Sequence, residues 1–320
     1  MIDRRRFLAT LAAGAATSAG AALAAARVPR VALISAGSRS IEALQAGLRA
    51  AGYVPGQTIV VEHRRTEGRP ERYRPAVEAA LKGGVDVIVV GSTHGLAAAR
   101  TATRTVPIVA VDLETDPVAS GFVESLARPG GNVTGFFLDL GDLSGKLLQL
   151  LQEAVPGVNR VAALHDPVIG LPQLQATRAA AGPAGITLLP APVQKAGDLS
   201  AAIESAARDG ARALVVLSAP LMRVNQTRID ELALRHRLPS VTLFALLPNG
   251  HGFLSYGQDL DEMYRGSGSY VDRILKGARA AELPVQRPSR FELAVNLRTA
   301  KALRLSIPPP LIVGADRVIE

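Results

Sequence analysis

A histidine and an aspartate stand side by side at His165 and Asp166, directly after the apolar run "RVAAL". A histidine next to a carboxylate can act as a general base. Acyl-transfer chemistry also needs an activated nucleophile, and "GSTHG" at 91–95 has its serine one position too early for the G-x-S-x-G elbow. A hydrolase or lyase that uses His165 and Asp166 is therefore the weaker hypothesis.

Hydroxyl and carboxylate side chains recur directly after apolar runs, where open α/β sheets bind their ligands. Hydroxyls and backbone N–H groups at helix starts suit an anion such as a carboxylate, and acidic side chains suit an ammonium group. Two such polar walls would hold a small zwitterion, with aromatic residues as a stacking surface. These residues are Ser35, Gly37, Ser38, Ser92, Thr93, Asp112, Glu114 and Asp116 in the first half, and His165, Asp166, Ser218, Phe244 and Tyr256 in the second.

Several of these residues also have a purely structural explanation. Ser92, Thr93 and Ser218 could be helix N-caps, and Asp116 before Pro117 could start a turn. We nevertheless predict that a solute is bound by Ser35, Ser38, Ser92, Thr93 and Asp116 from one side and by Asp166, Ser218, Phe244 and Tyr256 from the other.

No metal or cofactor is expected from the sequence. The other histidines, His63, His94, His236 and His251, are widely spaced and fit no metal-ligand pattern. The glycine-rich "RGSGS" at 265–269 does not follow a predicted strand, so it is a weak candidate for a phosphate loop.

The elements that must position these side chains form two successive α/β units. Apolar runs such as Val85–Val90 and Val106–Val111 alternate with amphipathic segments, as in parallel strands that helices cover on both faces. The alternation restarts after residue 137 and repeats the same architecture. The sequence thus predicts two doubly wound lobes with parallel sheets.

Between the two units lies "DPVASGFVESLARPGGNVTGF", at 116–136, which is poor in helix and strand signals. Its adjacent glycines permit backbone angles that other residues avoid, and the residues after them could enter a sheet as a crossing strand. We predict a crossover between lobes here, with an ordinary surface loop as the alternative. The predicted hinge residues are Gly130, Gly131, Val133 and Gly135.

The first 26 residues have the pattern of an export signal: three arginines, a modest uncharged run, and small residues before Arg27. We expect cleavage just before Arg27 and a periplasmic location. The order Arg4-Arg5-Arg6-Phe7-Leu8 resembles the twin-arginine signature, with a Sec signal and an uncleaved anchor as alternatives.

The amino-acid composition excludes several further kinds of site and binding partner. The chain has no cysteine, which excludes disulfides, cysteine metal sites and cysteine lipidation. Part of the net charge of +8 belongs to the signal, and the other basic residues are scattered among acidic ones. Nucleic acid is therefore not an expected partner, and we expect a soluble monomer.

Three long stretches resemble the ABC-transporter substrate-binding family that includes tryptophan and tyrosine uptake proteins. They are "GLRAAGYVPGQTIVVEHR", "DPVASGFVESLARPGGNVTG" and the tail "LPVQRPSRFELAVNLRTAKALRLSIPPPLIVGADRVIE". The resemblance implies a type I periplasmic-binding fold, in which three crossovers join two lobes. On this basis we assign 27–134 plus 257–289 to lobe I and 135–256 plus 290–320 to lobe II. It also implies delivery of a small solute, an amino acid or related carboxylate, to an inner-membrane ABC permease.

The resemblance also implies a function for individual residues. It matches Ser35, the pair Ser92 and Thr93, the segment 116–118 and the segment 255–257 to ligand-binding or motif positions of the family. The sequence departs from the family at His251 and Arg304, where glycine is expected, and the first of these changes bears on ligand identity.

Aromatic residues make up only 4% of the chain and tryptophan is absent, so an aromatic pocket would depend on Phe244, Tyr256, Phe136 or Phe137. A ligand-sensing domain for a membrane receptor is the alternative function.

Overall fold

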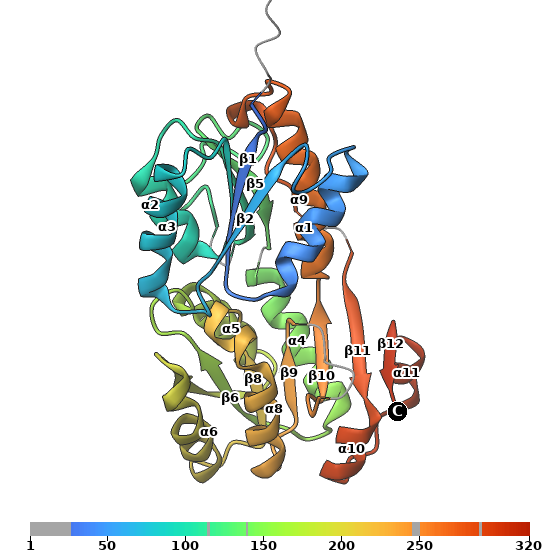
Figure 1. Cartoon of the computed structure of the whole chain (residues 1–320). Coiled ribbons are helices and arrows are strands. Elements are labelled where there is room, and N and C mark those ends of the chain that lie inside the picture. Colours follow the sequence, from blue (N-terminus) through green and yellow to red (C-terminus); the bar gives the residue numbers. More distant parts are fainter. Residues whose placement is uncertain (1–26, 114–115, 139, 245–249, 288–289) are drawn as a thin grey trace, which may run out of the picture.

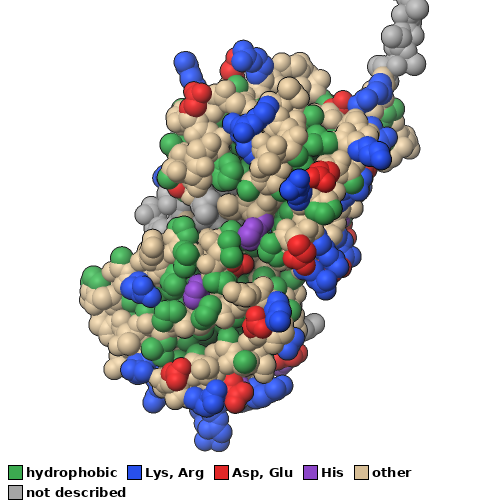
Figure 2. Space-filling model, turned by 90° about the vertical axis from the view of Figure 1, so that its left-hand side faces the viewer, with side chains coloured by type: hydrophobic (Ala, Val, Ile, Leu, Met, Phe, Trp, Pro, Cys, Tyr) green, Lys and Arg blue, Asp and Glu red, His purple; other side chains and the backbone are tan. Residues whose placement is uncertain are grey.

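The computed structural model describes residues 27–113, 116–138, 140–244, 250–287 and 290–320. These residues form two α/β lobes stacked end to end (Figure 1). The predicted export signal at 1–26 and the candidate Glu114 lie outside the described residues. Figure 2 shows hydrophobic side chains at the waist between the lobes and over the face of one lobe, with lysines and arginines at both ends and along one side of the molecule.

Lobe I is built on a sheet whose five described strands are all parallel, in the order β2-β1-β3-β4-β5. Apart from the edge strand β2, these strands are mostly buried and apolar, and they need a helical cover on each face. Helices α2 (Tyr73–Lys82) and α3 (Thr93–Ala102) cover one face, and α1 (Arg39–Ala50) and α9 (Leu260–Leu275) cover the other. The strands are β1 (Arg30–Ser35), β2 (Val60–Arg65), β3 (Val87–Gly91), β4 (Ile108–Leu113) and β5 (Val133–Phe137).

The segment "RGSGS" lies in the middle of α9, so the phosphate-loop hypothesis is wrong. Its glycines serve helix packing, because a Cβ on Gly268 would meet the backbone of Gly47 on α1 at 2.6 Å. Small residues let the two helix backbones approach closely and bury the face of α9 against lobe I.

Lobe II contains seven described strands in the order β12-β11-β10-β9-β8-β6-β7. Helices α4 (Leu140–Ala154) and α5 (Leu171–Ala181) pack together on the sheet, with α6 (Leu199–Arg208) and α8 (Gln226–Arg235) packed in a second apolar cluster. The strands are β6 (Arg160–His165), β7 (Thr187–Pro192), β8 (Ala213–Val216), β9 (Ser240–Thr242), β10 (Leu254–Gly257), β11 (Glu292–Asn296) and β12 (Arg317–Ile319). The short helices of this lobe are α7 (Pro220–Val224), α10 (Leu297–Leu303) and α11 (Pro309–Val313).

The predicted architecture of two parallel-sheet lobes is confirmed. One pair departs from it, since β10 and β11 are antiparallel. The reason is the route of the chain: after β10 it enters lobe I as α9 and comes back, so β11 runs in the opposite direction. No described helix combines the length and apolar character needed to cross a bilayer.

Three connections in the described chain cross between the lobes: after β5, between β10 and α9, and before β11. The predicted boundary after Thr134 falls inside β5, which pairs with β4 of lobe I up to Phe137. The predicted boundary after Tyr256 falls one residue before the end of β10. The chain leaves each sheet only when its strand reaches the boundary between the two lobes, which we call the seam. The crossovers therefore lie a few residues later than predicted.

The predicted hinge residues Gly130 and Gly131 precede β5 at the end of the sheet that faces away from lobe II. The Gly130 N–H donates to the Ala281 carbonyl within lobe I at 3.1 Å. Val133 and Gly135 lie inside β5. The structure therefore does not bring these four residues to the crossover, which follows Phe137.

Candidate functional site

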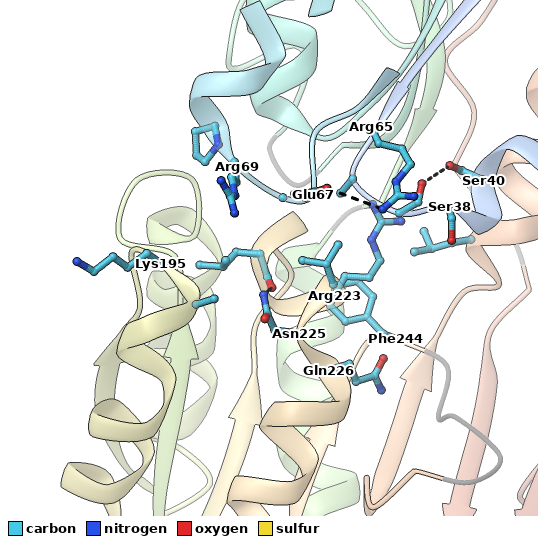
Figure 3. Close-up of a pocket in the computed structure, with 18 of the residues that line it drawn as sticks. Ser38, Ser40, Arg65, Glu67, Arg69, Lys195, Arg223, Asn225, Gln226 and Phe244 are labelled. Carbon is cyan, nitrogen blue, oxygen red and sulfur yellow. Dashed lines mark hydrogen bonds and ion pairs between the residues drawn. The ribbon is translucent and has the colours of Figure 1, made fainter. Parts of the chain in front are cut away.

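A cavity of about 900 Å³ lies between the two lobes. The described strands of the lobe I sheet end at the seam. The neighbouring parallel strands of lobe II also end there, so the loops that follow the strands form the walls of the cavity. Figure 3 shows Arg65, Glu67 and Arg69 reaching down from lobe I toward Arg223 and Gln226 of lobe II. The polar lining also includes Ser38, Ser40, Glu71, Gln194, Lys195, Asn225, Gln258, Asp259 and Asp261.

The wall of the cavity carries both signs of charge. Glu67 on this wall lies 3.9 Å from the lining residue Arg65 and 2.6 Å from Arg72, which stands outside the cavity lining. The Asp259 carboxylate caps α9 by accepting from the Asp261 N–H at 2.8 Å. Such a mixed lining suits a ligand that carries both a carboxylate and an ammonium group.

A small inner pocket of about 10 Å³ adjoins this cavity. Phe244, Gln258 and Leu260 line both spaces, so the inner pocket is the deep end of the cleft. Its other walls are apolar apart from one hydroxyl, and they consist of Leu138, Leu140, Leu143, Leu243 and Ser218.

Three polar atoms on the walls of the cavity and of its inner pocket have no hydrogen-bond partner in the described part of the chain. They are Gln226 Nε2 in the cavity, Ser218 Oγ in the inner pocket, and Gln258 Oε1, which belongs to both. Their residues are 8%, 1% and 8% exposed. Buried polar groups without partners are rare and destabilise a fold by about 1–3 kcal/mol each. A hydroxyl, an acceptor and a donor are therefore available on the walls of the cleft for a solute.

Ser35 is buried at the end of β1 and does not line the cavity. Its Oγ lies 2.6 Å from Ser40 Oγ and 2.9 Å from His63 Nε2. Ser35 thus orients Ser40, which does line the cavity together with the predicted residue Ser38. Burial, with a smaller contribution from Arg65, lowers the pKa of His63, so its imidazole is neutral at pH 7.

Ser92 occupies a strained backbone conformation, with φ 75° and ψ 156°, a region that is almost exclusive to glycine. It is buried and caps α3 by accepting from the Gly95 N–H at 3.4 Å. Neither Ser92 nor the adjacent Thr93 lines the 900 Å³ cavity. Backbone strain of this kind clusters at functional sites. Ser92 and Thr93 therefore stay candidates for solute binding, although they lie outside the cavity lining.

Asp116 and Asp166 form matching Asp-Pro-Val turns, one in each lobe. Each carboxylate accepts N–H bonds from the second and third following residues at 2.8 and 3.2 Å. His165 Nδ1 lies 3.1 Å from the Ala163 carbonyl. These hydrogen-bond partners of His165 and Asp166 are backbone groups, and the pair does not form the base and orienting carboxylate of a catalytic triad.

Asp166 also faces lobe I. Burial lowers the pKa of His94, at the start of α3, and the charge of Asp166 partly opposes that shift. The Asp166 carboxylate therefore lies close enough to His94 to influence it electrostatically.

Tyr256 lies away from the cavity. Its ring stacks on Phe291 of the neighbouring segment, with centroids 5.6 Å apart. Phe136 packs edge-on against Tyr270, and Phe137 lies under Arg287. Of the aromatic residues considered from the sequence, only Phe244 lines the cleft, and the structure adds Tyr264 of α9.

Sequence reasoning missed Arg65, Arg223, Gln226, Gln258 and Tyr264. Gln258 directly follows β10, so the rule that selects residues after strands would have found it. Arg65 ends an edge strand that has no long apolar run. Gln226 and Tyr264 lie in helices, where no spacing signal distinguishes them from surface or core residues.

Comparison with known proteins agrees with this geometry. The family model described as ABC transporter substrate binding protein matches residues 32–319. The tyrosine-binding protein of Clostridioides difficile is 22% identical over 256 residues, which cover 79% of this chain and 72% of that protein.

Two solved structures share the fold. A conserved domain protein from Vibrio cholerae has a TM-score of 0.84 at 23% identity, covering 91% of this chain and 100% of that one. The ABC domain from Streptococcus pneumonia in complex with L-Trp has a TM-score of 0.83 at 21% identity, covering 91% and 99%. The chain therefore belongs to the ABC transporter substrate-binding protein family.

Proposed function

We propose that this protein is the extracytoplasmic solute-binding component of an ABC importer. It captures one small polar solute between its lobes and delivers it to a membrane permease. The observation that carries this proposal is the cleft itself: an interlobe cavity of about 900 Å³ and the small inner pocket beside it, whose walls together hold three buried polar atoms without partners among the described residues.

The solute class follows from the distribution of charge in the cleft. Ionic side chains occupy the outer cavity, whereas the inner pocket contains leucines, Phe244 and the neutral polar groups of Ser218 and Gln258. The inner pocket of about 10 Å³ has room for about one water-sized group, so a solute with a charged end and a neutral, largely apolar end fits with its body in the outer cavity and its neutral end toward the inner pocket. An amino acid with an uncharged side chain, or a related carboxylate, has both ends.

The relatives agree with this class, since one is named for tyrosine and another was solved with L-Trp. Phe244 and Tyr264 are the aromatic side chains among the described residues that line the cavity. An aromatic solute would lie against them.

The proposed binding residues are Ser38, Ser40, Ser218, Gln226, Phe244 and Gln258, which line the cleft. Ser35 acts through Ser40. Ser92, Thr93, Asp116 and Asp166 remain candidates at the seam. The lobes close over the solute by rotation about the crossovers, as in other hinge-closing proteins.

Export to the periplasm, removal of residues 1–26 and a monomeric state are parts of the same proposal. A thermal-shift screen of neutral amino acids, keto acids and nucleosides tests it. A solute at 100 times its Kd stabilises the folded form by about 2.7 kcal/mol. The proposal fails if none of them raises the melting temperature, or if the purified protein instead hydrolyses an ester or amide panel.

A further inference from the structure

The two lobes touch backbone to backbone at one edge of the cavity. Gly68, in the loop after β2 of lobe I, faces Pro220 and Leu221 at the start of α7 in lobe II. A Cβ on Gly68 would lie 2.9 Å from the Pro220 carbonyl oxygen and 3.0 Å from Leu221 N and Cα. Gly68 and Leu221 both line the cavity, so the contact forms part of its rim.

Gly68 is also in the left-handed region, with φ +71°, where other residues are strained. Both features make glycine the residue that fits. A side chain would need either this loop or the start of α7 to move, and neither atom group it meets is a flexible side-chain end.

The loop that presents Gly68 is held firmly on lobe I. The Thr66 N–H donates to the Ser35 carbonyl at 2.9 Å, and the Arg69 N–H donates to the Thr66 carbonyl at 3.0 Å. Glu67 is paired with Arg72. The backbone hydrogen bond from Thr66 to Ser35 therefore ties the loop to the end of β1 in its own lobe.

The opposite surface is equally fixed. Pro220 is the first residue of α7 and is buried, and the Arg223 N–H donates to the Ala219 carbonyl at 3.1 Å. Two rigid surfaces that meet without an intervening side chain limit how closely the lobes approach.

We propose that the contact of Gly68 with Pro220 and Leu221 is the closure stop of this protein, and that it sets solute affinity by limiting how closely the lobes approach. The inference rests on the proposed function, because affinity is measured through it. When only the closed state binds well, the apparent Kd is the intrinsic Kd divided by the closed fraction. A group that holds the lobes apart at this point raises Kd even though the binding residues are unchanged.

The test compares Gly68→Ala with Gly56→Ala. Gly56 is a matched control in the same lobe: its φ is +87°, and a Cβ there would have no heavy atom within 4 Å. Both variants introduce the strain of a left-handed alanine, but only Gly68→Ala adds an atom between the lobes.

Lobe separation is measured first, by pulsed EPR between spin labels on Ala79→Cys and Ala201→Cys. These exposed alanines lie on α2 of lobe I and α6 of lobe II, and the chain has no cysteine of its own. We expect Gly68→Ala to lengthen the distance relative to the parent, and Gly56→Ala to leave it unchanged. Equal distances in all three proteins overturn the inference.

Solute affinity is measured second, with whichever amino acid stabilises the parent protein most. We expect the Kd of Gly68→Ala to rise at least tenfold with a faster dissociation rate, and that of Gly56→Ala to stay within twofold. If no solute binds the parent, the proposed function fails. The distance measurement still tests whether the Gly68 contact limits the approach of the lobes. If Gly68→Ala does not fold, Gly68→Asn, which tolerates φ > 0 better, takes its place.

Discussion

Removing the unpaired hydroxyl of Ser218 should stabilise the empty protein and weaken its binding of solute. Ser218 is 1% exposed, and its Oγ has no hydrogen-bond partner among the described residues. Its backbone N–H is held by Gln173 Oε1 at 2.8 Å, and that bond does not depend on the side chain. Ser218→Ala thus deletes one atom and leaves the local backbone in place.

The magnitude follows from the penalty of an unsatisfied buried hydroxyl. Relieving it should raise the free energy of unfolding by about 1 kcal/mol, which corresponds to a rise in Tm of about 2 °C for a chain of this size. In the complex the same hydroxyl bonds to the solute. Its loss should therefore raise Kd about tenfold, the equivalent of about 1.4 kcal/mol.

The assay combines urea unfolding without solute and titration calorimetry with it. Thr134→Val is the matched control, because it deletes a buried hydroxyl that is paired: Thr134 Oγ1 donates to the Leu283 carbonyl at 2.7 Å, outside the cleft. The control should lose about 1 kcal/mol of stability and keep its Kd. If Ser218→Ala destabilises the empty protein, or binds solute as tightly as the parent, the assignment of Ser218 to the solute is refuted.

Three further predictions concern other parts of the chain. Burial raises the pKa of Asp230 to about 7. The stability that this carboxyl contributes to the fold is therefore fully present below the unfolded pKa near 4, and it is lost as pH rises through 7. The total is of order 4 kcal/mol, and Asp230→Asn should abolish this slope in urea unfolding measured from pH 4 to 8. Ser92→Gly should relieve backbone strain and raise stability by about 1 kcal/mol, whereas a loss of stability would mean that the lost helix cap outweighs the strain. Mass spectrometry of exported protein should find Arg27 at the N-terminus, and replacing Arg4 and Arg5 by lysine should block export by the twin-arginine route but not by Sec.

The fold could be predicted because its signals are local and repeated. Strands such as β3 and β4 are continuous apolar runs, and each is followed by an amphipathic helix, which determines a parallel sheet. The positions of the crossovers were not predictable, because the residue at which a strand leaves its sheet depends on where the opposite lobe begins. Gly130 and Gly131 look like hinge residues but lie at the far end of the sheet.

The site was predictable where position after a strand suffices, as for Ser38, Ser218 and Phe244, which line the cleft. It was not predictable where contacts between segments distant in the sequence determine whether a side chain reaches the cleft. Tyr256 lies within β10, and it stacks on Phe291 because β11 returns beside β10. Gln226 reaches the cleft from the first residue of a helix, a position that no sequence pattern marks as functional.

A crystal structure of the protein with the solute that stabilises it most would test the central claim directly. The account predicts electron density for one solute molecule between the lobes, with its charged end in the outer cavity and its neutral end within hydrogen-bond distance of Ser218 Oγ or Gln258 Oε1. Density for the solute at any other place on the molecule, with the interlobe cavity occupied by water alone, would contradict it.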